Sequence, residues 1–82
     1  MKKLLYFSST WCQPCKSFKP TMEKLSAQYP VTFIDVDVSA QTAVKYNVRN
    51  VPTTILIDNQ GTELGRLVGV KTEAEIIALY NR

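Results

Sequence analysis

The feature that most constrains this sequence is a pair of cysteines between a short apolar run and an amphipathic segment. The apolar run covers residues 4–7, and the cysteines are Cys12 and Cys15. Large apolar residues then recur at intervals of four, three and four, which places them on one face of a helix; they are Phe18, Met22, Leu25 and Tyr29. The pattern predicts a buried strand, a turn, and a helix that ends before Pro30 and has the cysteines at its start.

The middle of the chain predicts a second strand and a short helix. Residues 31–38 are mostly β-branched or aromatic, which is typical of a strand. Ser39 is a candidate N-cap for a helix that extends to Tyr46, and Asn47 tolerates the left-handed conformation common at helix ends. A right-handed crossover through the first helix makes the second strand parallel to the first.

The last part of the chain predicts a hairpin and a closing helix. Residues 53–57 form a third strand, and a turn at 58–61 leads into an antiparallel fourth strand that ends at Val68. Thr72 and Glu75 have the spacing of a capping box and begin the last helix. We therefore expect an α/β fold of order β-α-β-α-β-β-α, with a four-stranded mixed sheet and helices on both faces.

Length and charge narrow the class of protein. The 82 residues leave room for one domain, assigned to residues 1–82. Ten Lys and Arg against seven Asp and Glu give a net charge of +3, too small an excess to indicate a nucleic-acid partner. The apolar run at the start ends at Phe7, short of the roughly 7–15 residues in a signal-peptide core, and no run approaches the roughly 20 residues of a membrane span. We expect a cytoplasmic monomer that does not bind membranes.

The cysteine pair is best explained by reactivity. The chain has two cysteines and no histidine, too few ligands for a closed zinc site, so no metal is expected. The loop that a Cys12–Cys15 disulfide would close is too short to add much stability. Cys12 lies at the predicted helix start, where free amides and the helix dipole stabilise a thiolate, and Cys15 is close enough to attack a mixed disulfide formed by Cys12. Lys16 either adds positive potential there or is simply solvated.

Two separated motifs resemble those of one family. The run Trp11, Cys12, Gln13, Pro14, Cys15, Lys16 is similar to the active-site motif of the thioredoxin family, in which Gly is usual at the position of Gln13. The run Val51, Pro52, Thr53 matches a second family motif, and further residues fall at similar intervals, namely Asp37, Tyr46, Gly61 and Gly69. The resemblance covers roughly residues 4–80.

The resemblance implies roles for these residues. Cys12 and Cys15 would be catalytic and form a redox-active disulfide, with no bound cofactor. Pro52 would be a cis-proline facing the cysteines, and the Val51 backbone would pair with an extended substrate chain. Trp11, Gln13 and Pro14 would complete the substrate-binding surface.

The chain departs from the family pattern in three ways. It begins at the first strand described above, so we expect it to lack the strand and helix that usually come earlier and to have an exposed edge at residues 31–38. Tyr6 and Phe33 stand where the family usually has a buried aspartate and a lysine, and we interpret both as core residues. Ser8 stands where bacterial members often have a second tryptophan.

These observations predict a thiol-disulfide oxidoreductase that reduces protein disulfides by dithiol exchange. Strong oxidants of this fold class tend to have a histidine between the cysteines, whereas Gln13 and Pro14 are uncharged. The expected partners are disulfide-containing proteins and an electron donor, either a reductase of the thioredoxin-reductase type or glutathione. Two alternatives remain open. One is a glutathione-linked, glutaredoxin-like enzyme, and the other is a non-catalytic subunit or a dimer that shares an iron–sulfur cluster through Cys12.

Overall fold

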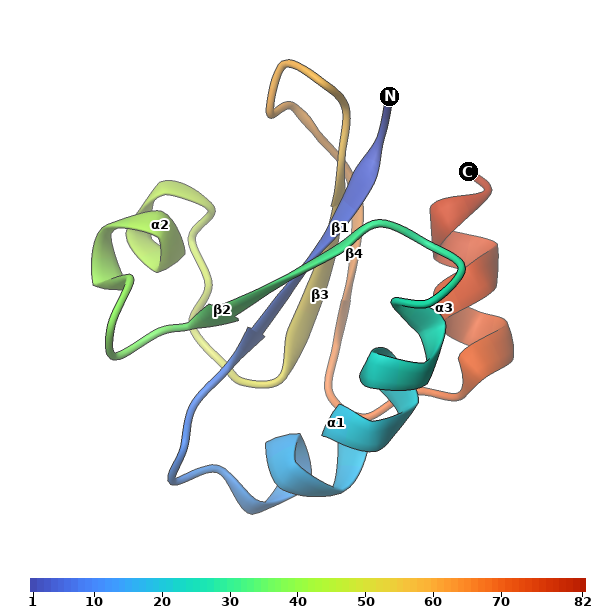
Figure 1. Ribbon diagram of the computed structural model, residues 1–82. Helices are drawn as coiled ribbons and strands as arrows, with labels where there is room; N and C mark the ends of the chain where they lie inside the picture. Colours follow the sequence, from blue (N-terminus) through green and yellow to red (C-terminus); the bar gives the residue numbers. More distant parts are fainter.

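The four strands of this protein form one mixed sheet in the order β2-β1-β3-β4. The computed structural model describes all residues, 1–82 (Figure 1). β1 is parallel to β2 and antiparallel to β3, and β3 is antiparallel to β4. The elements in chain order are β1 (Lys3–Ser8), α1 (Gln13–Leu25), β2 (Val31–Asp35), α2 (Ala40–Lys45), β3 (Thr53–Ile57), β4 (Glu63–Val68) and α3 (Glu73–Tyr80). The predicted fold class and element order are confirmed.

Helices cover both faces of the sheet and bury a separate apolar cluster on each. α1 and α3 lie on one face and α2 lies on the other (Figure 1). Alternate residues of β1 point to opposite faces, because side chains alternate along a strand. The cluster under α1 and α3 contains Leu4, Tyr6, Phe18, Met22, Leu25, Leu56, Ile76 and Leu79. The cluster under α2 contains Leu5, Phe7, Ile34, Ala43, Ile55 and Ile57.

Two elements are shorter than the sequence pattern predicts. β2 ends at Asp35 rather than Val38, because the Asp35 carbonyl accepts the amide hydrogens of Val38 and Ser39 and starts a turn. α1 ends at Leu25 rather than continuing to Tyr29, because the amides of Ala27 and Gln28 bond three residues back, to the Lys24 and Leu25 carbonyls, instead of four. Local backbone hydrogen bonds therefore end both elements before their apolar pattern ends.

The predicted helix signals have mixed outcomes. Thr72 and Glu75 form the capping box of α3. Ser39 is the N-cap residue of α2, but its side chain makes no capping hydrogen bond. Asn47 has a φ of 55° and lies in the left-handed region, as expected.

The two residues interpreted as core differ in burial. Tyr6 is fully buried, as predicted. Phe33 is 42% exposed, which corrects that interpretation, because it lies on β2 at the edge of the sheet. It still contacts the core, since its ring meets the Tyr6 ring edge-on with 5.7 Å between centroids.

The sheet brings the cysteine motif and the motif Val51, Pro52, Thr53 to the same end of the molecule. β1 runs toward Cys12 and ends at Ser8. β3 is antiparallel to it and begins at Thr53, which pairs with Phe7. The residues before Thr53 therefore lie across from the cysteines. The longest helix, α1, has 13 residues, and none of the helices has the length and apolar character of a membrane span.

Candidate active site

Cys12 is the N-cap residue of α1. Its backbone is extended, with φ −90° and ψ 110°, and its sulfur accepts a hydrogen bond from the amide of Cys15 at 3.2 Å. Pro14 lies in the first turn, where a missing amide hydrogen leaves no acceptor unpaired. The first turn of α1 thus directs an amide and the positive end of the helix dipole at the Cys12 sulfur.

Cys12 and Cys15 form a disulfide in this structure, with their Cα atoms 5.2 Å apart. Cys12 is 5% exposed and Cys15 is 2% exposed. No group of three or more His, Cys, Asp or Glu residues that could hold a metal ion is present. The redox-active pair predicted from the sequence is therefore assembled at the start of α1.

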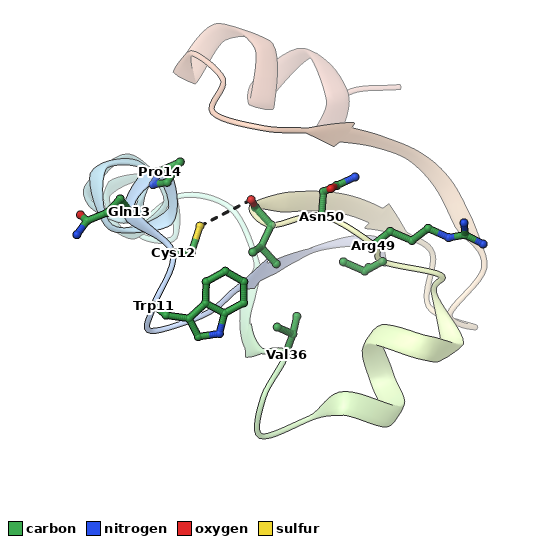
Figure 2. Close-up of a pocket in the computed structure, with 9 residues that line it drawn as sticks. Trp11, Cys12, Gln13, Pro14, Val36, Arg49 and Asn50 are labelled. Carbon is green, nitrogen blue, oxygen red and sulfur yellow. Dashed lines mark hydrogen bonds between the residues drawn. The ribbon is translucent and has the colours of Figure 1, made fainter.

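The segment that precedes β3 faces the Cys12 sulfur. The Val51–Pro52 peptide bond is cis, as expected, and Pro52 is buried. The Val51 carbonyl oxygen lies 3.7 Å from the Cys12 sulfur, along the dashed line in Figure 2. In the disulfide this sulfur has no hydrogen to donate, so the contact becomes a hydrogen bond only when Cys12 is a thiol.

A groove of about 420 Å³ adjoins Cys12 and is called the Cys12 groove here. Five of the predicted site residues line it, namely Trp11, Cys12, Gln13, Pro14 and Val51 (Figure 2). Pro52 and Cys15 do not line it. The structure therefore gathers the predicted surface residues around one cysteine and leaves the second outside the groove.

Four further residues line the Cys12 groove that the sequence did not indicate: Val36, Val48, Arg49 and Asn50. Three of them directly precede Val51, so their position next to a predicted binding residue is the sequence feature that could have indicated them. Val36 follows β2, and its amide bonds to the Ser8 carbonyl at 2.9 Å. The parallel pairing of β2 with β1 therefore brings Val36 to the groove.

Trp11 is held beside the groove by Asp37. The indole nitrogen donates to the Asp37 carboxylate at 2.9 Å, while 68% of the Trp11 surface stays exposed. The amide of Trp11 also donates to the hydroxyl of Ser9 at 3.2 Å. The tryptophan is thus a fixed apolar wall open to a partner.

Tyr6 lies behind the cysteine pair. Its hydroxyl donates to the backbone carbonyl of Cys15 at 3.2 Å. Its ring packs edge-on against Phe18, with 5.7 Å between centroids. Burial raises the pKa of Tyr6 to about 12, because the charged phenolate would lose its hydration.

Comparisons with known proteins agree with this arrangement. The thioredoxin family model matches residues 1–82. The thioredoxin of Chlamydia trachomatis is 37% identical over 82 residues, which cover 96% of this chain and 79% of that protein. A Staphylococcus aureus thioredoxin is 32% identical over 84 residues, which cover 98% of this chain and 80% of the relative.

Solved structures give the same result. A mutant thioredoxin from Halobacterium salinarum superposes with a TM-score of 0.88 at 34% identity, covering 98% of this chain and 72% of that one. The thioredoxin of Fasciola hepatica superposes with a TM-score of 0.89 at 28% identity, covering 99% of this chain and 79% of that one. The chain belongs to the thioredoxin family, and its Cys12 and Cys15 pair gives it thiol-disulfide oxidoreductase activity.

Proposed function

We propose that this protein works as a reductant of disulfides in other proteins, with Cys12 as the attacking thiolate and Cys15 as the resolving thiol. The observation that supports these roles best is the hydrogen bond from the Cys15 amide to the Cys12 sulfur at the N-cap of α1. A thiolate at a helix N-cap is stabilised by such amides and by the helix dipole. Cys12 also adjoins the groove, whereas Cys15 does not.

The exchange has two steps. The Cys12 thiolate attacks one sulfur of the substrate disulfide, forming a mixed disulfide and releasing the other substrate sulfur as a thiolate that takes a proton from solvent. Cys15 then loses its proton and attacks the Cys12 sulfur. The second substrate sulfur leaves as a thiolate and is protonated, and the Cys12–Cys15 disulfide remains. Two electrons have passed from this protein to the substrate.

The Cys12 groove is suited to an extended substrate segment. The backbone N–H of Val51 has no hydrogen-bond partner within the chain, so it can donate to a substrate carbonyl. The exposed faces of Trp11 and Pro14 offer apolar contact on the other side of Cys12. Backbone pairing of this kind accepts many sequences, as recognition by an added strand does.

The reducing direction follows from the residues between the cysteines. Gln13 and Pro14 are uncharged, and no histidine adds further stabilisation to the Cys12 thiolate. The reduced form is then less favoured than in strong oxidants of the same fold class, so the dithiol gives up its electrons more readily. This chemistry belongs in a reducing compartment, and we propose that the protein acts in the cytoplasm as a single-domain monomer.

Insulin reduction tests this function. Wild-type protein is driven in parallel by thioredoxin reductase with NADPH and by glutathione, which identifies the type of donor. Cys12→Ser should abolish reduction, and Cys15→Ser should accumulate a mixed disulfide with insulin. Accumulation in Cys12→Ser instead would reverse the two roles, and absence of insulin reduction with either donor would refute the reductase function.

A further inference from the structure

The two cysteines line different pockets. Cys12 lines the Cys12 groove, and Cys15 lines a second pocket of about 340 Å³. This second pocket, called the Cys15 pocket here, is bounded by the end of β1, the start of α1 and the end of β2. Its lining includes Ser8, Thr10, Lys16, Lys19, Phe33 and Asp35. Although Cys15 is only 2% exposed, it therefore lines an opening toward solvent that is separate from the groove proposed for the substrate.

The core behind Cys15 offers no group that can accept its proton near neutral pH. The resolving step requires that Cys15 lose its proton before it attacks. Tyr6 is the titratable side chain that faces it from β1, and its hydroxyl already donates to the Cys15 carbonyl. With a pKa of about 12, this hydroxyl stays protonated at neutral pH. The chain has no histidine, so the proton must leave toward solvent.

Three charged side chains line the Cys15 pocket. Lys16 and Lys19 come from α1, and both are exposed. Asp35 comes from β2 and is the register partner of Ser8 at the end of β1. Its carboxylate accepts the amide hydrogen of Asp37 at 2.8 Å, which fixes the side chain at the end of the strand. The pocket thus combines two cations with one anion around the Cys15 side of the pair.

We propose that Cys15 exchanges its proton with solvent through the Cys15 pocket, where Lys19 promotes formation of the thiolate and Asp35 opposes it. This inference rests on the resolving role of Cys15 proposed above. Lys19 follows Cys15 by four residues, a spacing that places two side chains next to each other on a helix. Lys16 follows Cys12 by four residues and also lines the Cys15 pocket, so Lys19 gives the more selective test of Cys15.

The expected effects have opposite signs. A nearby cation favours the charged thiolate and a nearby anion disfavours it. Because Lys19 is exposed and Asp35 is only partly buried, each effect is modest, about two- to fivefold in the thiolate population at low salt. At about 1 M salt, where the screening length falls to about 3 Å, both effects should largely disappear.

A titration of Cys15 as the only cysteine tests the proposal. In a Cys12→Ser background, the Cβ chemical shift of Cys15 is followed by NMR against pH, in low and high salt. Adding Lys19→Gln should lower the thiolate population near neutral pH two- to fivefold, and adding Asp35→Asn should raise it by a similar factor. Lys3→Gln removes the same charge at the opposite end of β1 and should change nothing.

The two-cysteine protein supplies the second measurement. Rapid-quench kinetics should show slower release of the mixed disulfide in Lys19→Gln and faster release in Asp35→Asn. The proposal is overturned if both variants move the Cys15 titration in the same direction or leave it unchanged. It is also overturned if the shifts of the Cys15 titration are as large at high salt as at low salt. If the titration shifts as expected but Cys15→Ser resolves the mixed disulfide at the wild-type rate, the proposed role of Cys15 is wrong and the electrostatic effect stands.

Discussion

The Tyr6 hydroxyl donates a hydrogen bond to the backbone carbonyl of Cys15 across 3.2 Å, and so connects the centre of the sheet to the first turn of α1. Tyr6 is fully buried, so this is a polar contact inside an otherwise apolar cluster. The hydroxyl is satisfied without a charged partner, and it anchors the backbone of the cysteine that we propose resolves the mixed disulfide. The Tyr6 hydroxyl could therefore have a structural role, a role in proton transfer, or both, and removing it distinguishes these roles.

Tyr6→Phe should keep disulfide reduction within a few-fold of wild type at neutral pH. The substitution keeps the ring and removes one hydrogen bond, which should cost about 1 kcal/mol of unfolding free energy. Insulin reduction and denaturant unfolding measure the two quantities. A loss of activity on the order of 100-fold, the scale of a removed general acid or base, would show that the hydroxyl takes part in proton transfer.

Tyr6 should also give the protein a characteristic loss of stability in alkali. Burial raises the pKa of Tyr6 to about 12 in the folded protein, above its ordinary value near 10. A group whose pKa is raised on folding contributes its full stability below the unfolded pKa and loses it as pH rises through the folded pKa. Between pH 10 and 12 the oxidised wild type should therefore lose about 2–3 kcal/mol relative to Tyr6→Phe. A stability difference between the two proteins that stays constant over this range would contradict the assignment.

The element order could be read from the sequence because the patterns were local. The helical spacing from Phe18 to Leu25 and the capping box at Thr72 each lie within a few turns of chain, and both features are present in the structure. The cysteine pair was predicted for the same reason, since its spacing and its place at a helix start are local properties.

The remaining features depend on contacts between distant segments. The bond from Tyr6 to Cys15 requires the exact height of α1 above β1, which no residue pattern specifies. The separation of Cys12 and Cys15 into two pockets arises where β1, β2 and α1 converge. The sequence predicts a core position for Phe33 next to Tyr6, yet its exposure depends on its edge position in the sheet.

The contact between Trp11 and Asp37 should tune substrate binding more than turnover. Asp37→Ala removes the acceptor of the indole nitrogen, so the exposed ring becomes more mobile. We expect KM for a protein disulfide to rise a few-fold, with a smaller change in kcat and less than about 0.5 kcal/mol change in stability. Trp11 is the only tryptophan, so fluorescence anisotropy reports its mobility directly.

Glu23→Ala provides the matched control for this measurement. Glu23 is an exposed acidic residue of α1, and its removal changes the net charge by the same amount. It should leave KM and the anisotropy of Trp11 unchanged. Equal KM values for Asp37→Ala and Glu23→Ala would mean that the position of the indole ring does not matter for substrate binding.

Arg66 joins β4 to the segment that leads to the Cys12 groove. Its guanidinium donates to both carboxylate oxygens of Glu63 at 2.7 Å and to the Tyr46 carbonyl at 2.5 Å. Tyr46 is the C-cap residue of α2, and the chain continues from it to Val51. The arginine thus fixes the start of the segment whose end lies beside Cys12.

Arg66→Lys should therefore weaken both stability and substrate binding. A lysine cannot reproduce the paired geometry of the guanidinium, so it cannot hold Glu63 and Tyr46 together. We expect a loss of about 1–2 kcal/mol in unfolding free energy and a rise in KM of a few-fold, with kcat changed less. Lys24→Gln is the control, because it breaks the exposed ion pair with Glu73 and should cost less than about 0.5 kcal/mol.

The pH dependence of the Arg66→Lys effect identifies its origin. The hydrogen bonds from Arg66 hold the pKa of Glu63 below its usual range, against the opposing effect of burial. A group whose pKa is lowered on folding contributes stability above its unfolded pKa and loses it as pH falls through the folded pKa. The stability difference between wild type and Arg66→Lys should therefore narrow as pH falls below the ordinary glutamate pKa of about 4.3 and then through the lowered pKa of Glu63. A difference that stays the same from neutral to acid pH would show that Arg66 acts through the Tyr46 carbonyl alone, and the ion pair would have no part in holding the segment in place.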